Sequence, residues 1–280
     1  MSELQKQIEA ATGEKFRSLP AQSGRVVAES GAAYFLKCGS VSAAYRCEAN
    51  GLAALAASGE IRVAEVVAVG DSYLLTRYVE TSPATPEFFA RFGRELARLH
   101  RHTASQFGFY EDNFIGATPQ LNIPDATEQH EWSAFYFNKR LLFQFRLAEK
   151  NGYADAEFKL LTVAIQKNIR RILNHAPEPP SLMHGDLWRG NFLCDTDGRA
   201  VLIDPAVYYG HREADLAMTR LFGGFPLTFY EAYHSEYPMR PASEYRDGIY
   251  RLYHILNHLN IFGTSYLYEA KELMRLYKYV

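Results

Sequence analysis

Short runs of β-type residues dominate the first third of the chain. Residues 25–37, RVVAESGAAYFLK, place two such runs around a Glu-Ser-Gly turn, which predicts a β-hairpin. Residues 61–69 and 73–79 read as two further strands separated by a Gly-Asp turn. Between the hairpin and these strands, residues 40–59 carry apolar side chains at helical spacing. The pattern predicts a small lobe of strands with one helix.

The periodicity becomes helical after the sequence Thr-Ser-Pro that ends at residue 83. The run EFFARFGRELARLHRH, residues 87–102, places its phenylalanines and leucines on one helical face. Further helices are predicted at residues 132–151, 155–174, 213–222, 227–235 and 245–277. Residues 181–206 interrupt them as a strand-like island, in which FLCD and AVLID flank a Thr-Asp-Gly turn. We therefore expect an α+β protein with two lobes, residues 1–80 and residues 81–280.

Composition and charge narrow the class of protein. The 280 residues are 48% hydrophobic and 22% charged, which is typical of a globular protein with a large core. The formal charge of −2 offers no general attraction to nucleic acid or to anionic membranes. Three isolated cysteines and a polar N-terminus without an apolar signal core predict a soluble protein of the cytoplasm.

Three oxygen-bearing side chains follow a spacing that suits phosphoryl transfer. Asp186 and Asn191 lie in the loop HGDLWRGN, and Asp204 closes the apolar strand VLID. A loose, charge-spreading transition state needs mainly a positioned hydroxyl and a metal held against the phosphates. We expect Asp186 to orient and deprotonate the hydroxyl, and Asn191 and Asp204 to bind Mg²⁺ through oxygen.

Two nearby residues are expected to support this loop. The ring of His184 can form local hydrogen bonds, and the next residue is a glycine that permits unusual backbone angles. Asp215 lies near apolar residues at the start of a predicted helix, GHREADLAM. We expect its carboxylate to accept hydrogen bonds from backbone amides of the catalytic loop.

Lys37 and Glu48 each place a charge on an apolar face. Neither should be buried alone, so we expect the two to pair. Breaking a buried ion pair typically costs about 3–5 kcal/mol, and its retention suggests a role in holding the α- and β-phosphates of a nucleotide. Five residues then occur in the chain order that one mechanism requires.

These residues resemble the fructosamine kinase (ketosamine kinase) family, which belongs with aminoglycoside and choline kinases among protein-kinase-like phosphotransferases. The resemblance extends from about residue 16 to the C-terminus. It is carried by HGDLWRGN, IDPAVYYGHREADLAM, the EANGLAAL helix and DNFIGATPQLN. HGDLW joined to DPAVYYGHRE is the most specific of these motifs.

The resemblance implies a two-lobed protein-kinase-like fold, with ATP bound between the lobes and the acceptor on the helical side. It implies Asp186 as the base, Asn191 and Asp204 as Mg²⁺ ligands, Lys37 as the phosphate-binding lysine and Glu48 as its partner. Arg77, Tyr78 and Val79 match the hinge that would bind adenine. The implied reaction transfers the ATP γ-phosphate to the sugar 3-hydroxyl of a ketosamine, either a small molecule or a glycated protein lysine. The unstable product would shed its sugar, which is deglycation.

The chain departs from the family pattern at two places. The family carries a glycine-rich loop between its first strands, whereas PAQSGRVV offers only Gly24, so Ser23 and Gly24 are the candidates to cover the phosphates. Arg189 stands where the family more often has a small residue, and it could reach a phosphate or face water.

Several assignments have two readings from sequence alone. Trp188 could lie under the sugar ring or be an ordinary buried tryptophan. Asn113 could shape the acceptor side or be a turn residue. His254 and His258 could belong to a zinc site, but two helix histidines without a third ligand are the ordinary case. The function itself could instead be phosphorylation of another hydroxylated amine, or nucleotide binding by a non-catalytic pseudokinase.

Overall fold

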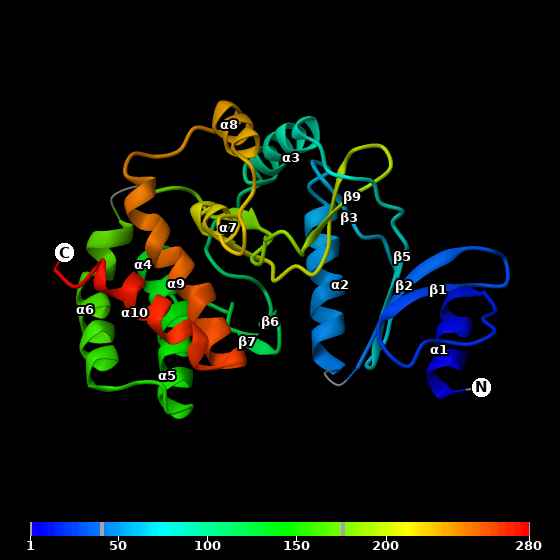
Figure 1. The fold of residues 1–280 in the computed structure, drawn as a ribbon, viewed down its shortest axis with the longest axis horizontal. Coiled ribbons are helices and arrows are strands. Elements are labelled where there is room, and N and C mark those ends of the chain that lie inside the picture. The colour runs from blue at the N-terminus through cyan, green and yellow to red at the C-terminus, as the bar shows by residue number, and fades with distance from the viewer. Residues whose placement is uncertain (1, 40–41, 175–176, 280) are drawn as a thin grey trace.

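The structure is a computed structural model that describes residues 2–39, 42–174 and 177–279. Residues 40 and 41, the start of the helical segment predicted at 40–59, lie outside this part. A strand-rich end and a helical end are separated along the long axis, with α2 (Ser42–Ala56) between them (Figure 1). The expected α+β content in two lobes is therefore present. Within the described residues, no helix combines the length and apolar character that crossing a bilayer requires.

The strand-rich end is a four-stranded antiparallel sheet. In spatial order its strands are β1 (Gly24–Val27), β2 (Ala33–Cys38), β5 (Tyr73–Arg77) and β4 (Val66–Val69). The predicted hairpin is confirmed as β1 and β2. Along β2 the side chains alternate, so that Tyr34 and Leu36 enter the core while Phe35 and Lys37 face the opposite side.

Helix α1 (Glu3–Thr12) covers the core face of this sheet and was not predicted from the sequence. Its Ile8 is fully buried in the same cluster as Tyr34 and Leu36. The signals were local, because the Ser2 side chain caps the amide of Gln5 at 3.1 Å and Gly13 ends the helix in a left-handed conformation.

The strand predicted at residues 61–69 is wrong as a single element. The chain bends after β3 (Arg62–Val63), which pairs in parallel with β10 (Ala200–Leu202). Only β4 joins the N-terminal sheet. The ion pair between Arg62 and Asp195, at 2.5 Å, accompanies the β3 pairing. Pairing with a strand that is remote in sequence decided this split, and it joins the N-terminal part to the predicted island.

The island forms as predicted, and two small sheets beside it were not predicted. β9 (Phe192–Cys194) and β10 make the expected antiparallel hairpin. β8 (Ser181–Met183) pairs with β11 (Tyr208–Gly210), and β6 (Asn113–Ile115) pairs with β7 (Thr118–Gln120). The turn reading of Asn113 is therefore wrong, because this residue begins a strand and is buried.

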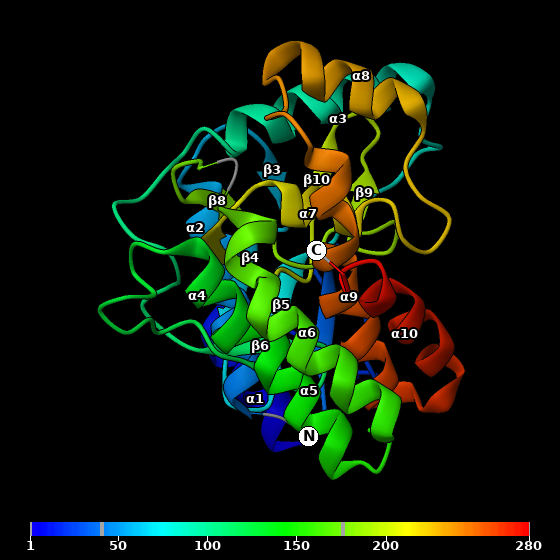
Figure 2. The same cartoon turned by 90° about the vertical axis from the view of Figure 1, so that its left-hand side faces the viewer.

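Beyond these sheets the chain is mainly a bundle of helices joined by loops (Figure 2). Its helices are α3 (Pro86–Leu99), α4 (Trp132–Tyr136), η1 (Phe137–Leu141), α5 (Leu142–Lys150), α6 (Ala156–Leu173), α7 (Glu213–Met218), α8 (Leu227–Glu236), α9 (Ser243–Phe262), η2 (Thr264–Tyr266) and α10 (Leu267–Arg275). The helix predicted at 132–151 is present with a π-helical turn, η1, in its middle. The helix predicted at 245–277 breaks at Gly263, whose φ of 93° ends α9.

Close packing of α3 against α8 fixes the top of the bundle. Gly93 lies at the crossing, where a Cβ atom would stand 2.2 Å from the carbonyl oxygen of Phe229. Only glycine allows this approach. Rings from α3, α8 and the β9–β10 hairpin meet there, with the Phe92 and Phe192 centroids 5.1 Å apart. This aromatic core anchors the β9–β10 hairpin to the bundle.

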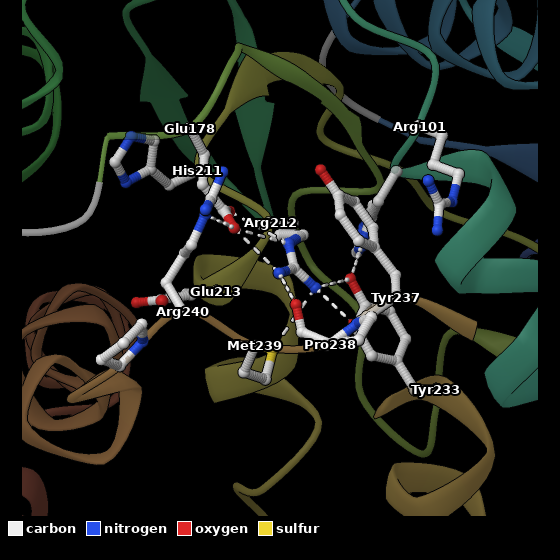
Figure 3. Close-up of polar contacts among 12 residues, drawn as sticks. Arg101, Glu178, His211, Arg212, Glu213, Tyr233, Tyr237, Pro238, Met239 and Arg240 are labelled. Carbon is white, nitrogen blue, oxygen red and sulfur yellow. Dashed lines mark hydrogen bonds and ion pairs between the residues drawn. The ribbon is translucent and has the colours of Figure 1, made fainter. Parts of the chain in front are cut away.

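Two buried ion pairs hold the segment around α7. Arg212, which is fully buried, meets Glu178 at 2.8 Å, and Arg246 meets Glu213 at 2.5 Å. Figure 3 shows the Arg212 guanidinium surrounded by acceptors, which include the carbonyl oxygens of Tyr237 and Pro238. Its charge is therefore fully compensated in a dry environment.

Replacing Glu178 with Gln should destabilise the protein strongly. The substitution keeps the side-chain volume but leaves the Arg212 charge without its partner, which typically costs about 3–5 kcal/mol. Urea unfolding monitored by circular dichroism measures the effect. Glu157→Gln is the matched control, because Glu157 is 45% exposed and its partner Arg275 is 39% exposed, and its loss should be about 1 kcal/mol or less. Equal effects of the two substitutions would contradict this interpretation.

Candidate active site

The loop that follows β8 is held by the carboxylate of Asp215 on α7. The Asp215 oxygens accept hydrogen bonds from the backbone amides of His184 at 2.7 Å and Gly185 at 2.8 Å. Gly185 has φ of 85°, and a Cβ atom there would stand 1.9 Å from the carbonyl oxygen of Ala206. The glycine is thus required both by its backbone conformation and by the neighbouring chain. The contacts expected of Asp215 are present.

A buried polar chain continues behind Asp215. His100 on α3 lies 3.2 Å from the Asp215 carboxylate through Nε2 and 2.7 Å from the Tyr233 hydroxyl through Nδ1. Arg212 donates to that hydroxyl at 3.3 Å. Burial alone would raise the pKa of Asp215, but the bonds from His100 and the loop amides lower it below its ordinary value. The charged carboxylate is therefore stabilised as an anchor of the loop.

The ring of His184 fixes the loop from inside. Its Nε2 donates to the carbonyl oxygen of Ile203 at 2.9 Å, and its Nδ1 accepts from the Asp186 amide at 3.3 Å. The contact with Asp186 is local, as expected for a structural histidine, whereas Ile203 lies 19 residues further along the chain. Burial lowers the pKa of His184, so the neutral ring that these bonds require is favoured.

Asp186 and Asn191 face each other across this loop. The Asn191 side-chain amide donates to the Asp186 carboxylate at 3.0 Å and to the Asp186 carbonyl oxygen at 2.8 Å. Burial raises the pKa of Asp186 to about 7, although the bond from Asn191 acts in the opposite direction. A carboxylate with this pKa can accept a proton near neutral pH.

Lys37 on β2 joins two carboxylates from different parts of the chain. Its ammonium group lies 2.7 Å from Glu48 on α2 and also contacts Asp204, which follows β10. Burial lowers the pKa of Lys37, but the attraction of the two carboxylates outweighs burial and raises the pKa above its ordinary value. Burial raises the pKa of Glu48. The expected Lys37–Glu48 pair is present, and Asp204 joins it.

Two cavities meet at Glu48 and Asp204. The first, of about 290 Å³, is mainly apolar and is lined by Phe35, Lys37, Glu48, Ala64, Thr76, Arg77, Tyr78, Val79, Thr81, Leu193, Ile203 and Asp204. The second, of about 240 Å³, is lined by Ala44, Cys47, Glu48, Asn113, Phe114, Gly116, Asp186, Trp188, Asn191, Asp204 and Pro205. The predicted hinge lines one cavity and the predicted base lines the other. A group transferred between the cavities would pass the shared carboxylates.

The donor atoms between the cavities suit Mg²⁺. The Asn191 amide nitrogen donates both of its hydrogen bonds to Asp186, which leaves the amide oxygen for a cation. Asp204 is presented by a left-handed backbone, with φ of 54°, a conformation that is rare outside glycine. One amide oxygen and one carboxylate, completed by phosphate and water, are a normal ligand set for Mg²⁺.

The predicted hinge leaves one backbone donor available. The Arg77 amide donates to Glu65 at 2.8 Å, and the Tyr78 amide donates to Ala33 at 3.1 Å. The Val79 amide has no hydrogen-bond partner among the described residues. It therefore offers an N–H group at the wall of the apolar cavity.

Ser23 and Gly24 do not line either cavity in the described part of the chain. The Ser23 hydroxyl instead accepts a hydrogen bond from the Cys38 amide at 3.1 Å and closes the open end of the β1–β2 hairpin. The structure thus places these two residues at the sheet edge beside Lys37's strand, without bringing them to the site.

A buried amide clamp connects the second cavity to the loop that carries Asp186. Gln120 on β7 donates to the carbonyl oxygen of Ala206 at 3.0 Å and to Asn113 at 2.9 Å, and it accepts from the Tyr253 hydroxyl at 2.8 Å. Asn113 donates to Val207 at 2.8 Å. Because Ala206 also touches Gly185, the clamp ties the cavity wall to the loop that carries Asp186.

Some site residues were missed from sequence. Thr76, Leu193 and Ile203 line the apolar cavity but are ordinary apolar or small strand residues in sequence. Phe35 had a signal, because it shares a strand face with Lys37. Gln120 had a weaker one, since a glutamine inside a short strand must find buried partners.

The positions of Trp188, His254 and His258 bear on the alternative interpretations of these residues. Trp188 is half-buried and lines the second cavity next to Asp186. His258 donates from Nδ1 to the carbonyl oxygen of His254 at 2.9 Å, which is an ordinary helix contact. No cluster of three or more His, Cys, Asp or Glu side chains suited to a metal occurs among the described residues.

Comparison with known proteins identifies the family. A family model described as fructosamine kinase matches residues 2–278. The chain belongs to the fructosamine kinase family. A probable ketoamine kinase of Synechocystis is 37% identical over 97% of this chain and 95% of its own length. The chloroplastic protein-ribulosamine 3-kinase of Arabidopsis thaliana is 36% identical over 83% of this chain and 71% of its own length.

Solved structures support the same family and show its wider fold. A crystal structure of a candidate fructosamine-3-kinase from Thermobifida fusca has a TM-score of 0.86 at 31% identity and covers 98% of both chains. An ADP-bound aminoglycoside phosphotransferase has a TM-score of 0.62 at 14% identity, covering 99% of this chain and 98% of its own. The fold of this fructosamine kinase family member is thus the protein-kinase-like fold predicted from its sequence.

Tyr253→Phe should reduce turnover through the amide clamp. The change leaves the Gln120 oxygen without its donor, so the clamp loosens and the Asp186 loop loses alignment with the cavity. A small misplacement of this kind costs about 10–100-fold in kcat. Steady-state kinetics with saturating ATP measures the effect.

Tyr277→Phe is the matched control, because Tyr277 is equally buried and donates one bond, at 2.7 Å, to Tyr245 away from the site. Both substitutions remove one buried hydrogen bond and should cost similar stability, about 1–3 kcal/mol. A loss of kcat in both variants, or in neither, would contradict a role for the clamp.

Asp186→Asn should raise the melting temperature of the metal-free protein at pH 8. The pKa of Asp186 is about 4 in the unfolded chain and about 7 in the folded protein. Between these pH values the folded state holds a proton that the unfolded state has lost, so the free energy of unfolding falls as the pH rises. Above pH 7 the full destabilisation by the Asp186 charge is present. The gain in Tm should therefore be smaller at pH 5. Differential scanning fluorimetry tests this, with the exposed Asp71→Asn as control. A lower Tm for Asp186→Asn at pH 8 would count against the assigned burial.

Proposed function

We propose that the protein is an ATP- and Mg²⁺-dependent kinase that phosphorylates the sugar 3-hydroxyl of ketosamines such as fructosamines and ribulosamines. The observation that carries this proposal is the meeting of two cavities at Glu48 and Asp204. One cavity is apolar and has the hinge, and the other contains the candidate base. Membership in the fructosamine kinase family supplies the reaction class.

Residues 1–80 act as the nucleotide-binding lobe in this proposal. The adenine lies in the apolar cavity against Phe35 and bonds the Val79 amide. The Lys37 ammonium, held by Glu48, binds the α- and β-phosphates. In the structure Lys37 also contacts Asp204, so phosphates and metal would replace one salt bridge with several charge-assisted contacts. Ser23 and Gly24 could cover the phosphates only after the hairpin moves towards them.

Residues 81–280 act as the catalytic and acceptor-binding lobe. The acceptor hydroxyl donates its proton to Asp186 as the oxygen attacks the γ-phosphorus and the bond to ADP breaks. Asn191 keeps the Asp186 carboxylate oriented through its 3.0 Å hydrogen bond. Asn191 and Asp204 would hold Mg²⁺, which neutralises charge on the phosphates when bound. Asp215 fixes the loop so that little reorganisation is needed.

The second cavity suits an acceptor with a positive charge. Three carboxylates line it, from Glu48, Asp186 and Asp204, and the described lining contains no lysine or arginine. An anionic sugar phosphate would be repelled there, whereas the secondary ammonium of a ketosamine would be attracted. The sugar ring would lie against Trp188. The names of the relatives, ketoamine kinase and protein-ribulosamine 3-kinase, agree with such an acceptor.

The 3-phosphorylated product would lose its sugar from the amine, so the cellular role that we propose is deglycation in the cytoplasm.

Charge alone does not separate ketosamines from aminoglycosides or choline, which are also cationic hydroxylated amines. Family membership favours ketosamines over both. A pseudokinase would have no need for the Asp186–Asn191–Asp204 set, all three of which line the second cavity.

An acceptor panel and one base variant test the proposal. ADP release should be fastest, by kcat/KM, with a ribulosamine or fructosamine, and slower with an aminoglycoside or choline. Asp186→Asn should lower kcat by about 10²–10⁴-fold, while nucleotide binding measured by calorimetry stays unchanged because Asp186 does not line the apolar cavity. The proposal fails if no ketosamine releases ADP above background, and the assignment of the base fails if the variant turns over normally.

A further inference from the structure

A row of aromatic rings leads out of the second cavity across the molecular surface. Trp188, which lines the cavity, lies 5.9 Å from Phe222, and Phe222 lies 4.6 Å from His258, measured between ring centroids. His258 lies 5.4 Å from Phe262 and 5.2 Å from Tyr266. We call these five rings the aromatic ledge. They come from four segments, so tertiary structure alone assembles them.

The ledge is open to solvent at its outer part. Phe262 is 64% exposed and Phe222 is 36% exposed, although both side chains are large and apolar. Phe222 has a left-handed backbone, with φ of 52°, which is uncommon for a bulky residue and costs on the order of 1 kcal/mol or more. Contiguous exposed rings of this kind are typical of binding surfaces rather than of an ordinary solvated face.

The ledge is also uncharged and is physically continuous with the cavity. Burial lowers the pKa of His258, so its ring is neutral, and its Nδ1–H is already donated to His254. Ile261, the residue before Phe262, packs next to Gly116, which lines the cavity. A Cβ atom on Gly116 would lie 3.5 Å from the Ile261 side chain. An acidic cavity thus adjoins a surface of aromatic rings, and Glu269 is the charged group that acts on His258 there.

The cavity is too small to hold a bulky acceptor entirely. Its volume of about 240 Å³ is less than the roughly 300–1,000 Å³ of pockets that enclose a drug-sized ligand. A sugar and its amine would fill it, and anything attached beyond the amine must extend outside the cavity, whose lining includes Trp188, the first ring of the ledge. The aromatic ledge is the surface that continues from there. A free amino acid would end near its start, whereas a polypeptide would reach Phe262 and Tyr266.

We propose that the aromatic ledge binds an apolar side chain next to a ketosamine-modified lysine in a polypeptide, which makes the enzyme selective for glycated peptides with apolar flanking residues. This inference rests on the proposed function. Burial of such a side chain against exposed rings removes apolar surface from water on both partners. Phe262 is the residue expected to contribute most, because it loses the most exposure and its side chain has little other support.

The experiment compares two synthetic peptides that carry the same ribulosyl-lysine, one flanked by leucines and one flanked by serines. The full-length protein should phosphorylate the leucine peptide with a kcat/KM about tenfold higher, the effect of about 1.4 kcal/mol of apolar contact. In Phe262→Ser this preference should fall to about twofold or less, with kcat/KM for free ribulosyl-lysine unchanged. Tyr268→Ser is the matched control, since Tyr268 is 73% exposed on α10 and has no place in the ledge, and its preference should remain tenfold.

The outcomes separate the two proposals. Phosphorylation of both peptides at equal rates by the wild-type protein would overturn the ledge assignment and leave the proposed function intact. A preference that survives Phe262→Ser would also overturn it. If neither peptide nor free ribulosyl-lysine is phosphorylated, the proposed function itself fails, and this inference falls with it.

Discussion

The contact of one ammonium group with two carboxylates organises the cleft. Lys37 comes from the sheet, Glu48 from the helix between the lobes, and Asp204 from the end of the island hairpin. Three charges in a partly dry place are tolerable only when they compensate one another, so their mutual positions are strongly constrained. This constraint sets where the apolar cavity ends and the acidic cavity begins. In a nucleotide complex, the phosphates would contact the Lys37 ammonium and the cation would contact the Asp204 carboxylate, so each charge would again face an opposite one.

The chain segment after Asp204 contacts both the loop that carries Asp186 and the hairpin that lines the second cavity. The carbonyl of Ala206 touches Gly185 on one side and accepts from Gln120 on the other. The loop with the proposed base Asp186 and the hairpin that lines the proposed acceptor cavity are therefore built on the same few peptide groups. Behind them, Asp215 and Arg212 extend the network into the bundle through buried hydrogen bonds. Such fully satisfied networks are rigid, which suits a reaction that depends mainly on positioning.

Charge and apolar surface divide the recognition of an acceptor between them. The carboxylates around Asp186 favour a cation in the cavity, and the rings beyond Trp188 favour an apolar group outside it. Electrostatic attraction is long-ranged and unspecific, whereas ring contacts act only when surfaces fit. The combination would let a small cavity accept many glycated amines while the ledge ranks them by what is attached.

The sequence by itself determined the local elements and the chemical types of the candidate catalytic groups. The hairpin of β1 and β2, the β9–β10 island and most helices follow from the side-chain periodicity, because local spacing fixes which face is apolar. Asp186 and Asn191 could be proposed as site residues from their spacing in the loop HGDLWRGN, and Asp204 from its place at the end of the following strand. Lys37 and Glu48 could be paired because each placed a charge on an apolar face.

Only the tertiary structure decided what depends on contacts between distant residues. It split the strand predicted at 61–69, since β3 pairs with β10. It moved Asn113 from a turn into a buried strand, where Gln120 and Val207 satisfy its amide. It kept Ser23 away from the cavities and brought rings from four segments into one ledge. Periodicity reports which face of an element is buried but not which partner buries it, so these features could not be read along the chain.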